Sequence, residues 1–456
     1  MSRLEDLFVK HVTFPLWAIR DGDGSVLKYL GEVRQYGALN RPVLIQRQEE
    51  GIRQLLRHAY ENTGYYKRVF DDQGFDPEDF SSRKDISVLP ALTKELIRDN
   101  YEDLVARNFE RQSLREYLTG GSTGVPLTFL RDPDCLRKRK AQEVFFDRWL
   151  GHDVGGRVAL FVAQHHYPGG AQGFKARLRN YTYGRLLCFD PYNIADEYME
   201  AFYQELKRFR PKVMKCFPNS LYCFAHFMKK RGLSGIHPVA VAATGETVHS
   251  DQKELFEDVF QCEVFERYGT IDAGLIASEC REHDGLHVFM DGAYVEFVND
   301  KNEPAREGEM ASLLVTDLYN YGMPFIRYRI GDIGIRTERR CPCGSDLEMI
   351  ERLYGRDRDI LVSERGDPKP GYLFVEIFNK LKIPGQFQVL QEKENEVLIR
   401  VVRGNGFTDD HEAAIRKGFA QLLGGGVRVD VDYVDEIARE ASGKYRYVHS
   451  KVSPFA

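Results

Sequence analysis

The chain has 456 residues, of which 43% are hydrophobic and 29% are charged. This length exceeds one typical domain, and the composition is that of a soluble globular enzyme. The net charge of −5 does not indicate nucleic-acid or membrane binding, and no run of residues approaches a membrane span. Residues 1–8 carry acids where a signal peptide needs a basic and then an apolar stretch. We therefore expect a cytoplasmic protein without a nucleic-acid or membrane partner, and the sequence sets no oligomeric state.

Helical periodicity appears first over residues 45–70, where Ile45, Ile52, Leu55, Leu56 and Ala59 share one face. This pattern predicts one amphipathic helix over the whole range. Residues 89–94 read as a loop, with Thr93 as the N-cap of the next helix.

A glycine-rich segment precedes an apolar-rich stretch, Val125 to Leu130. Its six residues are Thr119, Gly120, Gly121, Ser122, Thr123 and Gly124. Backbone N–H groups can approach phosphate oxygens here because glycine has no Cβ, and the hydroxyls add donors. Val125 and Pro126 stand where a Walker loop has Lys and Ser or Thr, so this is a phosphate loop of another type. A plain glycine-rich turn is the alternative.

From residue 157 strands and helices alternate. We expect strands over 157–163, 213–217 and 239–244, and helices over 196–209, 219–231 and 250–260, the last capped by Ser250. Such alternation predicts an α/β fold with a parallel sheet covered on both faces. Short strands after about 286 indicate a β-rich subdomain, and the tail beyond about 355 reads as a compact α+β domain. The predicted domains are 1–354 and 355–456.

Five further segments occur in order behind the glycine-rich loop: Thr244–Glu246, Arg267–Asp272, Tyr328–Asp332, Gly355–Asp359 and Ser442–Arg446. This ordered set resembles the adenylate-forming superfamily of acyl-CoA synthetases, adenylation domains and luciferases. Within it, the chain resembles the phenylacetate–CoA ligase branch and its capsule-biosynthesis relatives. The likeness spans residue 45 to the end and includes His58–Asn62, Leu89–Lys94 and Ala277–Cys280.

The resemblance implies a two-domain enzyme that binds ATP, with Thr119–Gly124 holding the β- and γ-phosphates. The other implied nucleotide-binding residues, from the adenine, ribose and domain-junction motifs, are Thr244, Gly245, Glu246, Arg267, Tyr268, Gly269, Thr270, Asp332 and Arg356. The Asp332 carboxylate would accept hydrogen bonds from the ribose hydroxyls. Both reactants of adenylation are anionic, so such a site must also neutralise the negative charge that develops in the transition state.

The resemblance also implies two catalytic residues and a moving small domain. Lys444, in a Gly-Lys pair near the C-terminus, matches the lysine that reaches the α-phosphate and carboxylate. Asp272 stands where the family has a magnesium-binding Glu, and it can still ligate Mg²⁺ because oxygen ligands suffice for a hard cation. Arg358 replaces an acid of the hinge motif, so the sequence does not show whether the small domain closes as it does in the family.

A separate set of residues has the composition of a structural zinc site. Cys341 and Cys343 form a close pair, and Cys280 and His287 stand further back, giving three sulfurs and one imidazole. Relatives with these motifs hold zinc there. His283 is the competing imidazole, and three free thiols in a reducing cell are the alternative. The remaining cysteines read as ordinary thiols: Cys135, Cys188, Cys216, Cys223 and Cys262.

The pocket for the acid is less well defined. His165, His166 and Tyr167 follow a strand end, where α/β sheets bind ligands, although a hydrophilic loop is an equal alternative. A predicted basic loop with Lys175, Arg177 and Arg179 could meet a phosphate of CoA or simply face solvent.

The predicted function is an ATP-dependent ligase that forms an acyl-adenylate from a small carboxylic acid, releases pyrophosphate and passes the acyl group to a thiol such as CoA or to an amine. The alternative is an adenylyl transferase that places AMP on a hydroxyl. A non-catalytic nucleotide-binding protein is disfavoured by Lys444, Asp332 and the intact loop. A zinc-ribbon nucleic-acid module is disfavoured by the single Cys-x-Cys and the net acidity.

Overall fold

The computed structural model describes residues 2–119, 127–162, 174–191, 193, 195–299, 301–356, 359–381, 383–438 and 446–452. It contains two compact units. The first comprises Met1–Glu296, Leu314–Arg329 and Thr337–Glu351, and the second comprises Phe297–Leu313, Ile330–Arg336 and Arg352–Ala456. The predicted domain boundary between residues 354 and 355 stays a prediction.

The largest sheet has eleven strands. They are β3 (Val158–Phe161), β4 (Leu186–Cys188), β5 (Val213–Cys216), β6 (Ala240–Thr244), β7 (Glu263–Thr270), β8 (Gly274–Glu279), β9 (Leu286–Val288), β10 (Ala293–Val298), β11 (Met310–Asp317), β12 (Tyr328–Thr337) and β13 (Met349–Arg356). Their order in space is β10-β11-β12-β13-β9-β8-β7-β6-β5-β3-β4. Strands β3 to β7 pair in parallel, whereas β8 pairs antiparallel with both β7 and β9. A separate antiparallel hairpin consists of β1 (Arg115–Leu118) and β2 (Thr128–Arg131).

The first unit contains the α-helices α1 to α12. They are α1 (Ser2–Phe8), α2 (Phe14–Arg20), α3 (Ser25–Tyr36), α4 (Arg41–Asn62), α5 (Gly64–Gln73), α6 (Lys94–Asp99), α7 (Tyr101–Leu104), α8 (Pro133–Trp149), α9 (Phe174–Arg179), α10 (Asp196–Phe209), α11 (Pro218–Lys230) and α12 (Ser250–Phe260). Short turns of 3-10 helix are η2 (Pro77–Asp79), η3 (Arg83–Val88) and η4 (Arg111–Ser113), and π-helical turns are η1 (Val9–Thr13) and η6 (Asn180–Gly184). No helix of the described residues is long and apolar enough to cross a membrane.

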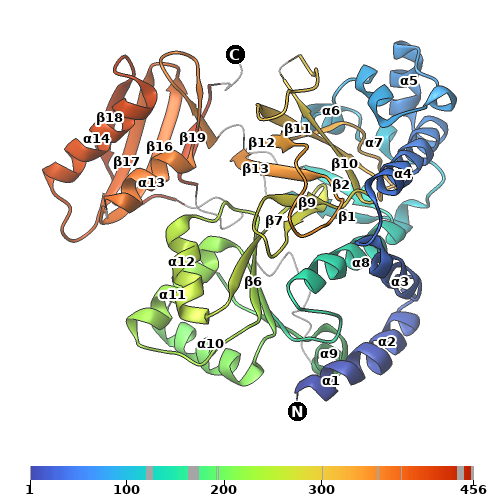
Figure 1. Ribbon diagram of the computed structural model, residues 1–456, viewed down its shortest axis with the longest axis horizontal. Helices are drawn as coiled ribbons and strands as arrows, with labels where there is room; N and C mark the ends of the chain where they lie inside the picture. The colour runs from blue at the N-terminus through green and yellow to red at the C-terminus, as the bar shows by residue number, and fades with distance from the viewer. Residues whose placement is uncertain are drawn as a thin grey trace. The chain divides into compact units, whose positions relative to one another are not determined.

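Both faces of the parallel strands are covered. In β6, Val241 and Ala243 belong to the core formed with α10, α11 and α12, whereas Ala240 and Ala242 pack on the other side with Phe265. Figure 1 shows α10, α11 and α12 together on one side of β6 and β7, with α8 on the other. A strand buried on both faces has no polar side to display, which explains the continuous apolar runs of these strands.

The C-terminal part of the second unit is a small α+β fold. It contains β14 (Ile360–Val362), β15 (Pro368–Pro370), α13 (Tyr372–Lys380), β16 (Gly385–Lys393), β17 (Glu396–Arg403), α14 (Asp409–Leu423), β18 (Arg428–Tyr433) and β19 (Val448–Ser450). Four strands form a sheet in the order β18-β17-β16-β19. Phe374, Phe419, Val389 and Ile399 join its single apolar core. The α/β fold with a large mixed sheet and a small α+β C-terminal domain is therefore confirmed.

Several local predictions are confirmed and three are wrong. Thr93 caps α6 by accepting from the Leu96 amide at 3.3 Å, as expected. The helix expected over 45–70 is instead two helices, because Thr63 adopts an extended conformation and its hydroxyl caps α5. His249, not Ser250, is the N-cap of α12. Lys175, Arg177 and Arg179 lie on the helix α9 rather than in a loop, since residues 174–179 continue the helical hydrogen bonding.

Candidate nucleotide site and metal cluster

The hairpin of β1 and β2 carries the predicted phosphate loop. Its base is closed by two hydrogen bonds: the Thr119 amide donates to the Leu127 carbonyl, and the Leu127 amide donates to the Thr119 hydroxyl, each at 2.9 Å. Thr119 therefore continues the ladder rather than lying in an open loop. The other predicted residues of this loop, Gly120, Gly121, Ser122, Thr123 and Gly124, lie outside the described residues.

A tight turn between β7 and β8 carries Asp272. The carboxylate is almost fully buried, and the Tyr328 hydroxyl donates to its Oδ2 atom at 2.5 Å. Within the turn, the Thr270 hydroxyl accepts from the Ala273 amide at 3.1 Å. The acid predicted to bind magnesium thus has a defined orientation within the first unit.

Two arginines, one buried and one largely buried, hold the backbone of this Asp272 turn. Arg131, the last residue of β2, donates to the Ile271 carbonyl, and Arg139 of α8 donates to the Ala273 carbonyl at 2.5 Å. Arg139 also forms an ion pair with the buried Asp317 at 2.6 Å. Because β2 follows the glycine-rich loop, Arg131 links the end of the predicted phosphate loop to the turn that carries Asp272.

Arg131 has an unusual environment for a cation. Its guanidinium lies over the rings of Tyr117 and Phe129 at 4.8 and 5.1 Å, and no carboxylate of the described residues forms an ion pair with it. Burial, reinforced by the neighbouring Arg139, lowers its pKa to about 10. The group stays charged at neutral pH, so it places a fixed positive charge at the base of the hairpin.

Glycines 269 and 274 are required by close contacts around the same turn. A Cβ on Gly269 would lie 2.5 Å from the Gly274 carbonyl oxygen. A Cβ on Gly274 would lie 1.5 Å from the Arg139 guanidinium, and its φ of +75° is in the left-handed region. Both positions therefore exclude any side chain while Arg139 holds the turn.

The predicted adenine-side residues lie at the ends of adjacent strands. Thr244 ends β6 and pairs with Arg267 of β7, and Gly245 follows with a φ of +77°. The Glu246 carboxylate accepts from the Asn219 amide at 3.0 Å, at the start of α11. These contacts bring Thr244, Gly245 and Glu246 to the same edge of the sheet as the Tyr268-Gly269 segment, where parallel α/β sheets bind ligands.

Arg267 takes part in a buried charge network. It lies 2.8 Å from Asp147 of α8, which also pairs with Lys215 of β5 at 2.9 Å. Burial alone would raise the pKa of Asp147, but Lys215 and Arg267 outweigh it and hold that pKa below its usual range. The guanidinium of Arg267 is thus engaged beneath the strand that carries Tyr268, and its direct contact with a nucleotide stays a prediction.

Asp332 and Arg356 both belong to the second unit and contact each other. Arg356 Nε lies 3.0 Å from Asp332 Oδ1, and Arg356 Nη1 donates to the Ile330 carbonyl at 2.9 Å. The Arg356 amide donates to Asp359, which also pairs with Arg446 at 2.7 Å. The structure therefore joins two residues that the sequence placed in separate motifs.

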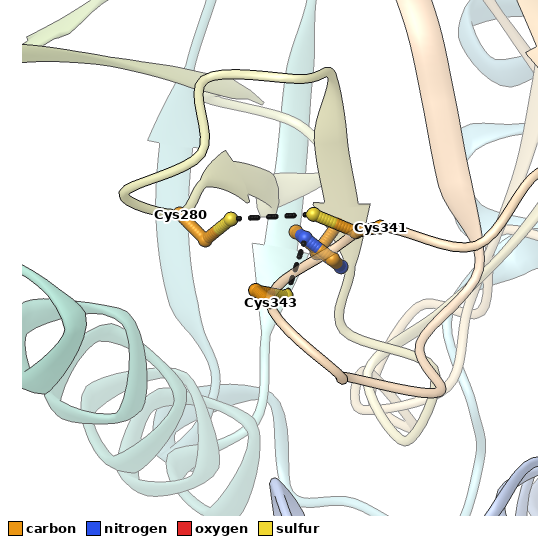
Figure 2. Close-up of side chains that lie close together, drawn as sticks. Cys280, Cys341 and Cys343 are labelled. Carbon is orange, nitrogen blue, oxygen red and sulfur yellow. Dashed lines mark hydrogen bonds between the residues drawn. The ribbon is translucent and has the colours of Figure 1, made fainter.

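Three cysteines and one histidine of the first unit form a compact cluster. The ligand atoms of Cys280, His287, Cys341 and Cys343 all lie within 4.8 Å of one another. Figure 2 shows the sulfurs of Cys280 and Cys341 facing each other, with Cys343 below them. The Cys280–Cys341 sulfur separation and the Cys343 sulfur to His287 Nε2 separation are both 3.6 Å.

These distances suit a tetrahedral metal ion. Zinc bonds of about 2.3 Å to sulfur and about 2.0 Å to nitrogen require ligand atoms roughly 3.5 to 3.8 Å apart. Burial lowers the pKa of His287 to about 4, so its imidazole is neutral and can act as a ligand. Burial raises the pKa of Cys280 and Cys341, so a bound cation has to displace their protons.

Secondary structure brings the four cluster residues together. Cys280 follows β8, His287 is the central residue of β9, and Cys341 and Cys343 lie in the connection between β12 and β13. Pairing of His287 with both Ser278 and Met349 closes the long gap in sequence. The competing His283 instead contacts Glu279 at 3.0 Å, so the cluster contains His287 rather than His283.

Some predicted residues lie outside the described residues: Lys444, Arg358, His165, His166 and Tyr167. Conversely, the roles of Arg131, Arg139 and Tyr328 were not predicted. Tyr328 is the first residue of the predicted Tyr328–Asp332 motif, although no role was assigned to it. For Arg131 and Arg139, nothing in a single sequence distinguishes a buried arginine from an exposed one. The charge of Arg131 directly after the apolar-rich stretch Val125–Leu130 is the signal that the sequence offers.

Solved structures similar to this chain include ligases caught after adenylation. A 2-hydroxyisobutyryl-CoA ligase in the postadenylation state aligns over 92% of both chains with a TM-score of 0.74 and 18% identity. The amide bond synthetase McbA from Marinactinospora thermotolerans aligns over 73% of this chain and 67% of its own, with a TM-score of 0.54 and 16% identity. The fold is that of the adenylate-forming ligases.

Sequence relatives narrow this class. Residues 364–451 match the CapK C-terminal domain model. Protein CapK of Staphylococcus aureus is 21% identical over 93% of this chain and 92% of its own length. The phenylacetate–coenzyme A ligase of Thermus thermophilus is 25% identical over 71% of this chain and 73% of its own. In sequence the chain is therefore similar both to phenylacetate–CoA ligases and to CapK, and its fold is that of the adenylate-forming ligases.

Proposed function

We propose that this protein is an AMP-forming acid–CoA ligase. A carboxylate oxygen of the acid attacks the α-phosphorus of ATP, the bond to the β-phosphate breaks, and pyrophosphate leaves. The acyl group then passes from AMP to the thiol of CoA. The observation that carries the proposal is the Asp272 turn, a buried carboxylate oriented by Tyr328 beside the base of the glycine-rich hairpin.

The chain's own residues would divide the work between phosphate binding and charge neutralisation. The hairpin loop Thr119–Gly124 would hold the β- and γ-phosphates, and Asp272 would hold Mg²⁺, which shields the phosphate charge during attack. Thr244–Glu246 and Tyr268-Gly269 would contact the adenine, and Asp332 would accept hydrogen bonds from the ribose hydroxyls. Arg131 would add a fixed positive charge near the departing pyrophosphate.

Lys444 would supply the charge at the α-phosphate and the carboxylate. The support for this role is its Gly443-Lys444 pair and its place within residues 364–451, which match the CapK C-terminal domain. A charge placed in this way is worth a factor of about 100 to 1,000 in rate. Closure of the small domain over the nucleotide would bring the lysine into position.

A panel of carboxylic acids, scored by pyrophosphate release, tests the first step. We expect release to depend on one class of acid, with thioester formation when CoA is added. The structural likeness to an amide bond synthetase makes amines the second acceptor to try. Pyrophosphate release without any acid, with AMP ending on a hydroxyl, would instead establish adenylyl transfer.

Variants at Lys444 and Asp272 test the assigned residues. Lys444→Ala should lower acid-dependent pyrophosphate release at least about 100-fold while ATP still binds. Lys451→Ala, an exposed lysine of the same tail paired with Glu392, is the matched control and should change nothing. Asp272→Ala should weaken magnesium-dependent turnover, whereas Asp272→Glu should be tolerated. Full activity of Lys444→Ala would contradict the assignment.

We further propose that the Cys280, His287, Cys341 and Cys343 cluster holds one structural zinc ion. Four protein ligands leave no open position for a reacting water. Elemental analysis of protein purified without chelator should find one zinc per chain. His287→Ala should remove it, whereas His283→Ala should leave it in place.

A further inference from the structure

The N-terminal helical segment α1–η1–α2 is apolar on two opposite sides. Val9, Phe14 and Ala18 are buried in a small core with Val26. The outward side shows six large apolar side chains that are between 40% and 78% exposed: Leu4, Leu7, Phe8, Val12, Leu16 and Ile19. A contiguous group of exposed apolar side chains of this size usually marks a surface that another molecule covers.

The helix α9 and the turn η6 extend this exposed surface. Trp17 Nε1 donates to the Thr182 hydroxyl at 3.0 Å, and the rings of Phe14 and Tyr183 stack at 5.0 Å. Leu178 and Tyr181 are exposed on this adjoining element. Figure 1 shows α1, α2 and α9 close together near the N-terminus. Of the twelve exposed large hydrophobic residues in the described chain, eight therefore lie on these two neighbouring segments.

Most of the exposed charges beside this surface are positive. Glu5 and Asp6 are half-buried and pair with the buried Arg185 at 3.5 and 3.2 Å. The exposed polar side chains within 4–20 and 175–181 are His11, Arg20, Lys175, Arg177, Arg179 and Asn180, so none is acidic. Asp21, just beyond, pairs with Arg179 at 2.5 Å. Asp21 is exposed and neutralises Arg179, whereas among the described residues no ion pair joins Lys175 or Arg177 to an acid, so these two cations border the exposed apolar side chains.

We propose that this surface, defined by the six exposed apolar residues of 4–19 together with Leu178, Tyr181, Lys175 and Arg177, binds the surface of an anionic phospholipid membrane. Apolar side chains enter the boundary between headgroups and acyl chains, while lysine and arginine meet the lipid phosphates. The whole-chain charge of −5 hid this surface, because a net charge averages over regions of opposite sign.

A second copy of the chain is a poorer occupant of the same surface. A two-fold interface brings the same patch of both subunits together, so the cations of one copy would meet those of the other. Like charges placed together at an interface are unfavourable, whereas anionic lipids neutralise them. Charge complementarity therefore favours the membrane.

Co-sedimentation of the full chain with phosphatidylcholine vesicles, with and without phosphatidylglycerol, tests the proposal. We expect binding only to the anionic vesicles, decreasing as salt is raised. Phe8→Asp/Leu16→Asp should weaken binding at least about tenfold by removing the apolar contact. Lys175→Glu/Arg177→Glu should weaken it by a similar factor by reversing two charges.

Val88→Asp is the matched control, since Val88 is an equally exposed apolar residue on a different element. It should bind anionic vesicles like the unaltered chain. Circular dichroism of each variant should be unchanged, and Phe8→Ser/Leu16→Ser offers a milder substitution if the acidic pair unfolds. Equal binding to neutral and anionic vesicles, no binding to either, or a dimer in sedimentation analysis that Phe8→Asp/Leu16→Asp dissociates would overturn the proposal.

Discussion

The two ends of β8 are secured in different ways. Before the strand, the Asp272 turn is held by internal cations, since Arg131 and Arg139 donate to its carbonyls. After the strand, Cys280 joins a cluster that gathers four ligand atoms within 4.8 Å but has no cation among its members. The Asp272 turn needs only groups of the chain itself, whereas the cysteine–histidine cluster is arranged to bind a metal ion. A chelator should therefore destabilise the cluster and leave the turn unaffected, and the following predictions use that difference.

The largest effect is expected at the cluster. Cys341→Ser/Cys343→Ser should lose the bound metal and lower the unfolding free energy by several kcal/mol, because structural zinc contributes on the order of 10 kcal/mol in small peptides. Denaturant unfolding with and without chelator measures this. Chelator should destabilise the unaltered chain and leave the variant unchanged. Cys262→Ser, a thiol outside the cluster, should behave like the unaltered chain; unchanged metal content in the double variant would contradict the site.

At the other end of β8, Arg139→Met should lower the unfolding free energy by about 3–5 kcal/mol, because it leaves the buried Asp317 without its cation. This loss should be the same with and without chelator. Adding Asp317→Asn should restore part of the stability, since the unpaired buried charge is removed. A loss that appears only in the presence of metal would mean that the two ends of β8 are not independent.

The buried His152 belongs to the Asp147 network beneath β7, since its Nε2 lies 3.9 Å from Asp147 Oδ2. Lowering the pH should therefore destabilise the folded chain through His152. Burial lowers the pKa of this imidazole to about 4, against about 6.5 in the unfolded chain. Between pH 6.5 and 4 the unfolded chain binds a proton that the folded chain does not, so stability falls by about 3 kcal/mol as pH falls through this window. His152→Asn should flatten that fall, measured as unfolding free energy against pH in the metal-free Cys341→Ser/Cys343→Ser background. An unchanged pH dependence of the unfolding free energy in His152→Asn would contradict the role of His152.

The smallest effect is expected from Tyr328→Phe, which removes only the hydroxyl that orients Asp272. A hydrogen bond to a charged group is worth about 1.5–3 kcal/mol, so turnover at saturating ATP should fall by about tenfold or more. The magnesium concentration needed for half-maximal activity should rise, because the carboxylate loses its fixed orientation. Phe325→Leu, a change in a neighbouring buried ring, serves as the control for packing. Unchanged magnesium dependence would mean that Tyr328 does not position Asp272.

The sequence was sufficient to predict regular helices and chemically distinctive residue sets. Helix α10 has the predicted bounds, because Phe202 and Leu206 recur at helical spacing and are both buried. The Cys3His set was found since metal ligands are chemically distinctive wherever they stand. The break at Thr63 was missed, because apolar periodicity continues through it and only the extended backbone of that residue separates α4 from α5.

Tertiary burial could not be predicted in the same way. Arg131 and Arg139 resemble ordinary surface arginines in sequence, and only the packing of β2 and α8 against the Asp272 turn buries them. The outward side of α1–η1–α2 was missed for the opposite reason, since its leucines and phenylalanine look like core residues. The local sequence shows which side chains are hydrophobic, but whether another part of the chain covers them depends on the tertiary structure.

The contact between Gly274 and Arg139 has a consequence for how related sequences can vary. A methyl group at position 274 would occupy the place of the guanidinium, which lies 1.5 Å from where that Cβ would stand. The two residues are 135 positions apart in sequence, yet neither can change alone without disturbing the Asp272 turn. Among homologues we therefore expect the pair to vary together: an arginine at the first position accompanies glycine at the second, and a larger residue at the second accompanies a shorter one at the first.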